Sequence, residues 1–532
     1  MARSIPPAEL KRRIREKDEL AILDLREEGA HSRSHLFYGS SLPLSRLELR
    51  LLDMVPRRST PVVLVDDDGS LSARAAERLE AFGYPDVAVL EGGVPGWEAA
   101  GYVLFSGVHV PSKAFGEWVE HHCSTPHIEA AELKAMMDAG EDLVVLDSRP
   151  MDEYRVMNIP TSTDVPGAEL ALRVHDLAPD PNTTVVVNCA GRTRSIIGAQ
   201  SLINAGIPNR VTALKNGTMG WHLAGFELER GQSRRYAETL SSEARARAER
   251  VVEHVARRYG IASIDKAGLA KWRAEAERRT LYVVDVRAAE EYEAGHLPGS
   301  IWAPGGQLVQ ETESWLATLG ARVVLVDDAR VRAYMTASWL KQMGWDEVAV
   351  LADPFDGETL ETGPMPYRLP SIAEAAHDSI APAELEAALA NDEAVVIDLA
   401  LSKDYEAGHI PGAWFAVRAR LAHAFSRLPG TCTIVFTSAD GIVARLAAPE
   451  ASELTARPVK ALAGGTRAWV DAGLPLESGL THMADERDDI WLKPYEEGGD
   501  REENMRRYLA WELDLVENIE RDGDHRFRLY PA

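Results

Sequence analysis

The chain has 532 residues, of which 45% are hydrophobic and 27% charged, and its formal net charge is −25. At roughly 100–200 residues per domain, this length predicts about three to five domains. The acidic balance disfavours nucleic acid and anionic membrane surfaces as partners.

The chain carries no pattern of membrane insertion or export. No apolar run reaches the roughly 18 residues of a membrane span, and the charged N-terminus lacks the apolar core of a signal peptide. The three cysteines, Cys123, Cys189 and Cys432, cannot all pair, and none has a CxxC or zinc-type spacing. We therefore expect a reducing, cytoplasmic location.

Four stretches begin alike and divide the chain into repeats. Each is an apolar run that ends in aspartate and is followed by a short acidic segment and a turn. The stretches are 21–40, 144–162, 282–300 and 395–413, with Asp24, Asp147, Asp285 and Asp398 as their aspartates. Because these aspartates recur in every repeat, we interpret them as structural loop caps.

A second apolar run follows in each repeat, and only one of the four carries a thiol. These runs are found at 62–70, 185–193, 323–331 and 433–441. Counting back 17 residues from the glycine that ends the next helical pattern aligns Cys189 with Asp66 and Asp327. The strand pattern of the fourth repeat aligns Ser438 with them.

The apolar runs are short and nearly continuous in Val, Ile and Leu, which is typical of strands buried on both faces. Strands that alternate with helical segments predict a mostly parallel sheet with helices on both faces. The predicted fold class is therefore α/β, in four tandem domains with a helical connector and a C-terminal helical tail. The predicted boundaries are 1–110, 111–232, 261–370 and 371–480 for the domains, 233–260 for the connector and 481–532 for the tail.

Cys189 lies between a predicted strand and a predicted helix, which is the usual place of a ligand site in a parallel sheet. The peptide N–H groups of a tight loop that opens a helix bind anions, and the helix dipole adds positive charge. With Arg192 and Arg194 beside it, the thiol is expected to have a pKa below the usual value of about 8.5. This makes Cys189 a candidate nucleophile.

The four repeats resemble domains of the rhodanese family of sulfurtransferases. The resemblance rests on the segments 285–300 and 398–413 and on the loop from Cys189 to Arg194, and it covers nearly all of the chain outside the connector and tail. It implies four tandem rhodanese-like domains with one active cysteine in the second. Cys189 would take a sulfane sulfur from a donor such as thiosulfate, become a persulfide and pass the sulfur to an acceptor, without a metal or organic cofactor.

Further candidate site residues surround the cysteine. The backbone amides of the loop would hold the anionic sulfur, the arginines would steer an anionic donor, and a hydroxyl would donate a hydrogen bond. Arg149 follows the first strand of the second domain and Lys215 lies in its last loop, where both are expected to line the mouth of the site. The candidate substrate-binding residues are Ala190, Gly191, Arg192, Thr193, Arg194, Ser195, Arg149 and Lys215.

The expected partners are a small anionic sulfur donor and a cyanide or thiol acceptor, with a homodimer left open. 3-Mercaptopyruvate is the second choice of donor. A non-catalytic scaffold, with Cys189 as a redox-responsive thiol, is the rival from another class. A phosphatase is the weakest alternative, because phosphatases of this fold have five residues between cysteine and arginine and this loop has four. Cys123 with its neighbouring histidines is interpreted as a helix end and not as a metal site.

Overall fold

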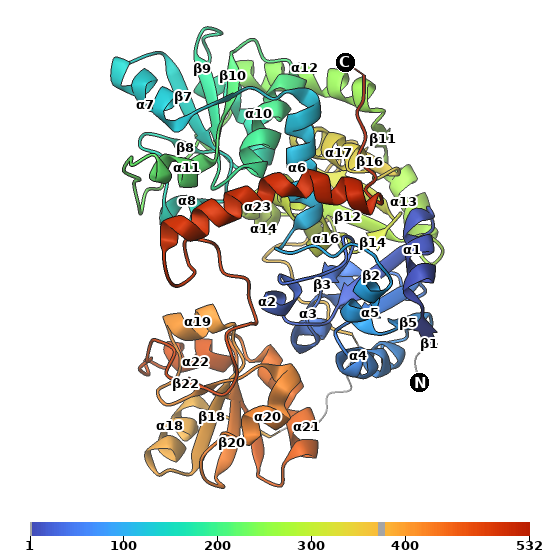
Figure 1. Ribbon diagram of the computed structural model, residues 1–532, viewed down its shortest axis with the longest axis vertical. Coiled ribbons are helices and arrows are strands. Elements are labelled where there is room, and N and C mark those ends of the chain that lie inside the picture. Colours follow the sequence, from blue (N-terminus) through green and yellow to red (C-terminus); the bar gives the residue numbers. More distant parts are fainter. Residues whose placement is uncertain (1–2, 371–377, 532) are drawn as a thin grey trace.

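The computed structural model describes residues 3–370 and 378–531 and contains four mostly parallel sheets flanked by helices (Figure 1). The predicted α/β class and the four tandem domains are confirmed. The predicted start of the fourth domain at residue 371 lies outside the described residues. In the ranges described, no helix is both long enough and apolar enough to cross a membrane.

The first domain has a sheet of order β1-β5-β4-β2-β14, with β3 also paired to β2. Its own strands are β1 (Arg3–Ile5), β2 (Leu20–Asp24), β3 (Ser40–Ser41), β4 (Val62–Val65) and β5 (Val87–Leu90). Its helices are α1 (Pro7–Arg15), α2 (Glu28–His31), α3 (Leu47–Met54), α4 (Ser70–Ala81) and α5 (Gly93–Ala99). The strand β14 (Thr318–Leu319) comes from the third domain and pairs antiparallel with β2.

The second domain has a parallel sheet of order β6-β10-β9-β7-β8. Its strands are β6 (His127–Ile128), β7 (Leu143–Asp147), β8 (Thr163–Asp164), β9 (Thr184–Asn188) and β10 (Val211–Leu214). Its helices are α6 (Val110–Cys123), α7 (Ala130–Ala139), α8 (Met151–Val156), α9 (Leu170–Leu177), α10 (Thr193–Ala205) and α11 (Gly217–Leu223). All five residues of the central strand β9 are buried, because helices cover both faces of the sheet.

The predicted connector forms helix α12 (Ser242–Tyr259), which is part of a shared core. The side chain of Ser241 caps this helix by accepting a hydrogen bond from the N–H of Ala244. One hydrophobic cluster continues from Val187 of β9 through Val252 of α12 to Val323 in the third domain. The second and third domains are therefore joined by buried apolar surface and not by a loose linker.

The third domain has the sheet order β11-β16-β15-β12-β13. Its strands are β11 (Ala262–Ile264), β12 (Leu281–Asp285), β13 (Ile301–Trp302), β15 (Arg322–Val326) and β16 (Val348–Leu351). Its helices are α13 (Lys266–Ala274), α14 (Ala289–Ala294), α15 (Gly305–Gln310), α16 (Thr312–Trp315) and α17 (Val331–Gln342).

The fourth domain has the sheet order β17-β21-β20-β18-β19-β22 and occupies the lower end of the molecule in Figure 1. Its strands are β17 (Ser379–Ile380), β18 (Ala394–Asp398), β19 (Trp414–Phe415), β20 (Thr433–Thr437), β21 (Val459–Leu462) and β22 (His482–Met483). Its helices are α18 (Pro382–Ala390), α19 (Ser402–Ala407), α20 (Leu421–Phe425), α21 (Ile442–Leu454) and α22 (Gly465–Asp471). A buried ion pair of 2.7 Å between Arg418 and Glu48 joins it to the first domain.

The tail returns from the fourth domain to the second, forms the long helix α23 (Arg501–Asp522) and continues for several residues beyond it. The predicted tail helix around 505–519 is confirmed, and it is longer than expected. Figure 1 shows α23 crossing the molecule beside α6. Leu515 and Ile519 of α23 are buried in one cluster with Phe115 and Val119 of α6. This contact brings the tail to the first helix of the thiol-bearing domain.

Candidate active site

Cys189 follows the last residue of β9, and helix α10 begins four residues later at Thr193. The thiol is 2% exposed and is not in a disulfide. The hydroxyl of Ser195, in the first turn of α10, donates a hydrogen bond of 3.0 Å to Sγ of Cys189. The sulfur therefore lies at the helix N-terminus, as the sequence predicts.

The start of α11 holds the Cys189 loop in place. The N–H of Thr218 donates to the carbonyl of Cys189 at 2.8 Å, and the N–H of Met219 donates to that of Ala190 at 3.0 Å. Gly217 has a φ of +54°, and a Cβ there would lie 2.3 Å from the Cys189 carbonyl oxygen. Only glycine fits this close approach, so the last loop of the domain fixes the geometry of the thiol loop.

The thiol pKa differs from the sequence-based prediction. Burial raises the pKa of Cys189 above its ordinary value, and the nearby carboxylate of Glu512 adds to this rise. The charge of Arg194 and the hydroxyl and N–H of Ser195 oppose it without cancelling it. The prediction of a lowered pKa was wrong, because the sequence does not show how deeply the sulfur is buried.

Both loop arginines are already paired with carboxylates. Arg194 makes hydrogen bonds of 2.8 and 3.0 Å to Glu153 of α8. Arg192 makes two of 2.8 Å to Glu117 of α6, and it also contacts Glu120. Their guanidinium groups line the site, but much of their positive charge is balanced by these neighbours.

Two predicted site residues lie elsewhere. Arg149 is fully buried, pairs with Asp147 at 2.7 Å and donates to the carbonyl of Met157 at 2.6 Å, so it braces the strand end as a structural ion pair. Lys215 pairs with Glu129 at 2.6 Å on a partly exposed surface. Neither side chain lines the cavity at Cys189, and the expectation that they line its mouth is corrected.

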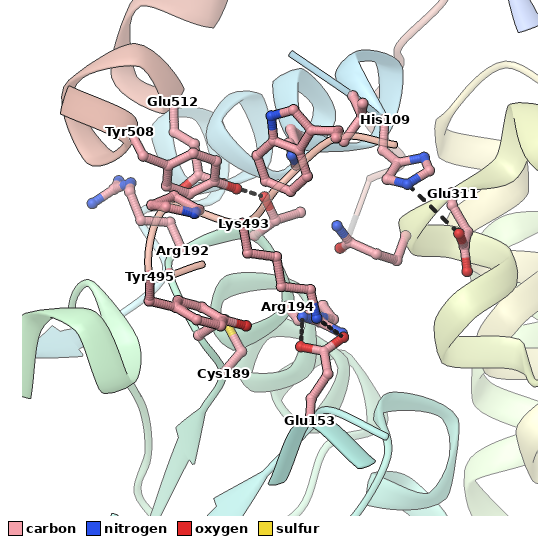
Figure 2. Close-up of a pocket in the computed structure, with 18 of the residues that line it drawn as sticks. His109, Glu153, Cys189, Arg192, Arg194, Glu311, Lys493, Tyr495, Tyr508 and Glu512 are labelled. Carbon is pink, nitrogen blue, oxygen red and sulfur yellow. Dashed lines mark hydrogen bonds and ion pairs between the residues drawn. The ribbon is translucent and has the colours of Figure 1, made fainter. Parts of the chain in front are cut away.

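A cavity of about 340 Å³ opens above Cys189 and is lined by every domain and by the tail. The loop residues from Ala190 to Arg194 line it, and Ser195 lies behind the sulfur. Each domain and the tail contribute lining residues. One example from each, in chain order, is Glu28, Glu153, Gln307, Lys403 and Trp491. Figure 2 shows Tyr495 and Tyr508 of the tail reaching the cavity that contains Cys189.

The profile of the rhodanese-like domain matches this sequence four times, at residues 6–100, 129–224, 267–357 and 381–472, which together make up most of the chain. The chain belongs to the rhodanese family.

This rhodanese is similar over its whole length to a solved structure. The crystal structure of thiosulfate sulfurtransferase from Pseudomonas aeruginosa is 48% identical, with a TM-score of 0.96, and the match covers 99% of this chain and 100% of that one. An HTH-type transcriptional regulator from Mycobacterium tuberculosis is 33% identical over 104 residues, or 20% of this chain. That match spans 45% of the regulator, less than half of its length.

In the first rhodanese domain, the equivalent loop has no thiol and binds an aspartate side chain. Asp66 stands at the position of Cys189 and is 1% exposed. Its carboxylate accepts hydrogen bonds from the N–H groups of Gly69, Leu71 and Ser72, at 2.8 to 3.2 Å, and from the Ser72 hydroxyl at 2.8 Å. The loop of this fold is therefore an anion-binding cradle, and in this domain a side chain of the protein fills it.

The third domain fills the corresponding place with an ion pair. Asp327 is fully buried and accepts a hydrogen bond of 2.9 Å from Nε of Arg332. Arg332 also pairs with Glu169 of the second domain at 2.7 Å. In the fourth domain the position is Ser438, whose hydroxyl accepts a hydrogen bond of 3.4 Å from the N–H of Ala444. Among the four equivalent positions, only Cys189 presents a thiol to a cavity.

Sequence reasoning missed the tail and α6 as parts of the site. Lys113 and Glu117 of α6 and Tyr508 and Glu512 of α23 all lie at or beside the cavity. Tyr508 donates a hydrogen bond of 2.9 Å to Oε1 of Glu512, which also accepts one of 3.4 Å from Thr193. The sequence signal that could have indicated this was the group of aromatic residues in the tail. Tyr and Trp side chains on one face of a helix usually pack against another part of the protein.

Proposed function

We propose that this rhodanese is a sulfurtransferase that takes a sulfane sulfur from thiosulfate and passes it to cyanide or a small thiol through a persulfide on Cys189. The observation that carries the proposal is the single thiol at the anion-binding loop, in a cavity of its own. The full-length similarity to a thiosulfate sulfurtransferase supports thiosulfate as the donor.

In the first step, the thiolate of Cys189 attacks the outer sulfur of thiosulfate. The S–S bond of the donor breaks, sulfite leaves with the bonding electron pair, and the cysteine becomes a persulfide anion. Proton loss from the thiol precedes the attack, and the Ser195 hydroxyl is placed to stabilise the thiolate.

The outer, anionic sulfur of the persulfide needs hydrogen-bond donors to stabilise its charge. In the first domain, the N–H groups of Gly69, Leu71 and Ser72 hold the Asp66 carboxylate. The equivalent positions in the second domain are Arg192, Arg194 and Ser195. We infer that their N–H groups hold the persulfide sulfur in the same way.

In the second step, a nucleophilic acceptor attacks the outer persulfide sulfur. Cyanide forms a bond to that sulfur, the S–S bond breaks, and Cys189 regains its thiolate while thiocyanate leaves. Because Cys189 is 2% exposed at the bottom of a cavity of about 340 Å³, which the tail helps to line, we expect a small acceptor. The free thiol has to stay reduced between turnovers, which fits a reducing compartment such as the cytoplasm.

The test is a thiosulfate-to-cyanide transfer assay with the intact mass recorded after thiosulfate alone. We expect turnover, and one added sulfur atom on the wild type. Cys189→Ser should abolish both, whereas Cys123→Ser and Cys432→Ser remove thiols that do not line the cavity and should retain them. A wild type that gains no sulfur from thiosulfate would overturn the proposal and direct attention to 3-mercaptopyruvate.

A further inference from the structure

Among the described residues that line the cavity, one cation has no carboxylate oxygen within 4.0 Å. His109, Arg192, Arg194, Lys403 and Lys493 each have a glutamate oxygen within 4.0 Å. Lys113 also lines the cavity, and among the described residues its ammonium group makes no ion pair and no side-chain hydrogen bond. It is 4% exposed, so its three N–H donors are also largely withdrawn from bulk water.

Aromatic rings surround this ammonium group, and all of them come from the tail. Nζ of Lys113 lies 4.9 Å from the ring centre of Trp491, 5.2 Å from that of Tyr508 and 5.0 Å from that of Trp511. Ring faces attract a cation but accept few hydrogen bonds, so they stabilise the charge without using its donors. Burial lowers the pKa of Lys113 to about 8, although the charges of Glu512, Glu313 and Glu28 oppose this shift. An anion bound beside the ammonium group would raise the pKa further toward its ordinary value.

Helix α6 presents Lys113 to the thiol loop. A Cβ on Gly116 would lie 2.7 Å from Cγ2 of Thr193, so the helix packs directly on the start of α10. Glu117, one turn after Lys113, pairs with Arg192 of the loop. Residues three and four apart share one face of a helix, which places Lys113 on the face that covers the site.

We propose that Lys113, held in its cage of tail aromatics, is the binding residue for the sulfonate end of the donor and for the departing sulfite. This rests on the proposed function. The two arginines of the loop keep their glutamate partners, and the dianion pairs with Lys113, which has no carboxylate oxygen within ion-pair distance. The ammonium group supplies hydrogen bonds to the sulfonate oxygens, while the outer sulfur points toward Cys189. The tail thereby takes part in donor recognition, although it lies outside all four rhodanese domains.

The test compares Lys113→Met, which keeps the aliphatic stem, with Lys113→Arg, which keeps the charge, and with Lys215→Met as the matched control on the outer surface. We expect Lys113→Met to raise the KM for thiosulfate about tenfold or more, with a smaller change in kcat, which corresponds to losing one charge-assisted contact. Lys113→Arg should restore most of the affinity, and Lys215→Met should behave like the wild type. Melting temperatures identify any variant that fails to fold.

A second measurement separates this inference from the proposed function. Calorimetry of sulfite binding uses the Cys189→Ser variant with and without Lys113→Met, so no chemistry takes place. Binding that weakens about tenfold without Lys113 supports the site, even if the wild type takes no sulfur from thiosulfate. Equal sulfite affinity, or an unchanged KM in an active Lys113→Met variant, would overturn it.

Discussion

The hydroxyl of Ser195 donates a hydrogen bond of 3.0 Å to the sulfur of Cys189. The first domain repeats this relationship six residues apart, since Ser72 donates to Asp66 at 2.8 Å. A serine in the first turn of the helix therefore donates a hydrogen bond to the anionic group of the loop, whether that group is a thiolate or a carboxylate.

Ser195→Ala should slow sulfur uptake at neutral pH about fivefold, the factor that corresponds to one hydrogen bond of ~1 kcal/mol. The cause is a smaller thiolate fraction, because the thiolate loses a donor that the thiol needs less. Single-turnover release of sulfite measures the rate. The defect should shrink as the pH rises, and a defect of equal size at every pH would contradict this role.

Wild-type sulfur uptake should rise with pH from 6 through the ordinary thiol range near 8.5 and beyond. Burial raises the pKa of Cys189, so the thiol stays protonated to a higher pH than a free cysteine does and only the deprotonated form attacks. Rapid-mixing measurements of sulfite release with saturating thiosulfate give the profile. A rate that is flat over this range would mean that the thiolate already prevails at pH 6.

Asp66→Ala should destabilise the first domain by about 2 kcal/mol, because it leaves the buried N–H and hydroxyl of Ser72 and the half-buried N–H groups of Gly69 and Leu71 without their acceptor. Thermal melting checks this. Asp67→Ala is the control: its side chain is 61% exposed, and its ion pair with Arg26 should contribute little. Equal effects of the two changes would argue against an anion-binding cradle.

Gly107→Ala should displace the tail helix from the site. Gly107 has a φ of +94°, and a Cβ there would lie 2.3 Å from the ring of Trp511. Backbone strain and overpacking together should cost about 3 kcal/mol, and the KM for thiosulfate should rise as Trp511 leaves Lys113.

The matched control for this variant is Gly101→Ala. Gly101 has a φ of +82° with no atom within 4 Å of the added Cβ, so strain alone should cost about 1 kcal/mol and leave the KM unchanged. If both variants lost stability and thiosulfate affinity to the same extent, Trp511 would have no particular role in thiosulfate binding.

The repeats, the sheets and the position of the thiol loop were predictable because their signals are local. A predicted strand that runs into cysteine, followed by a helical pattern, places Cys189 at the carboxyl end of a strand without any long-range information. The helices at 242–259 and 501–522 are likewise predictable from local periodicity, although the contacts that they make are not predictable in this way.

The remaining features of the site depend on contacts between distant segments. Glu117 pairs with Arg192 across 75 residues, and Glu512 approaches Thr193 across 319. No pattern in a single sequence indicates which of many glutamates neutralises an arginine, so both loop arginines looked free. The prediction for Arg149 was wrong for the opposite reason: its partner Asp147 is only two residues away, and the ion pair that they form is fully buried.

The strand β14 has a consequence for synthesis on the ribosome. It covers the edge of β2 at Leu20 and Ala21, yet it lies roughly 300 residues further along the chain. At roughly 5–20 residues per second, the nascent first domain waits about 15–60 s with this short edge unpaired. An open strand edge is a template for pairing with other chains. In the interval between the translation of Leu20 and that of Leu319, this edge of β2 is therefore open to pairing with other chains.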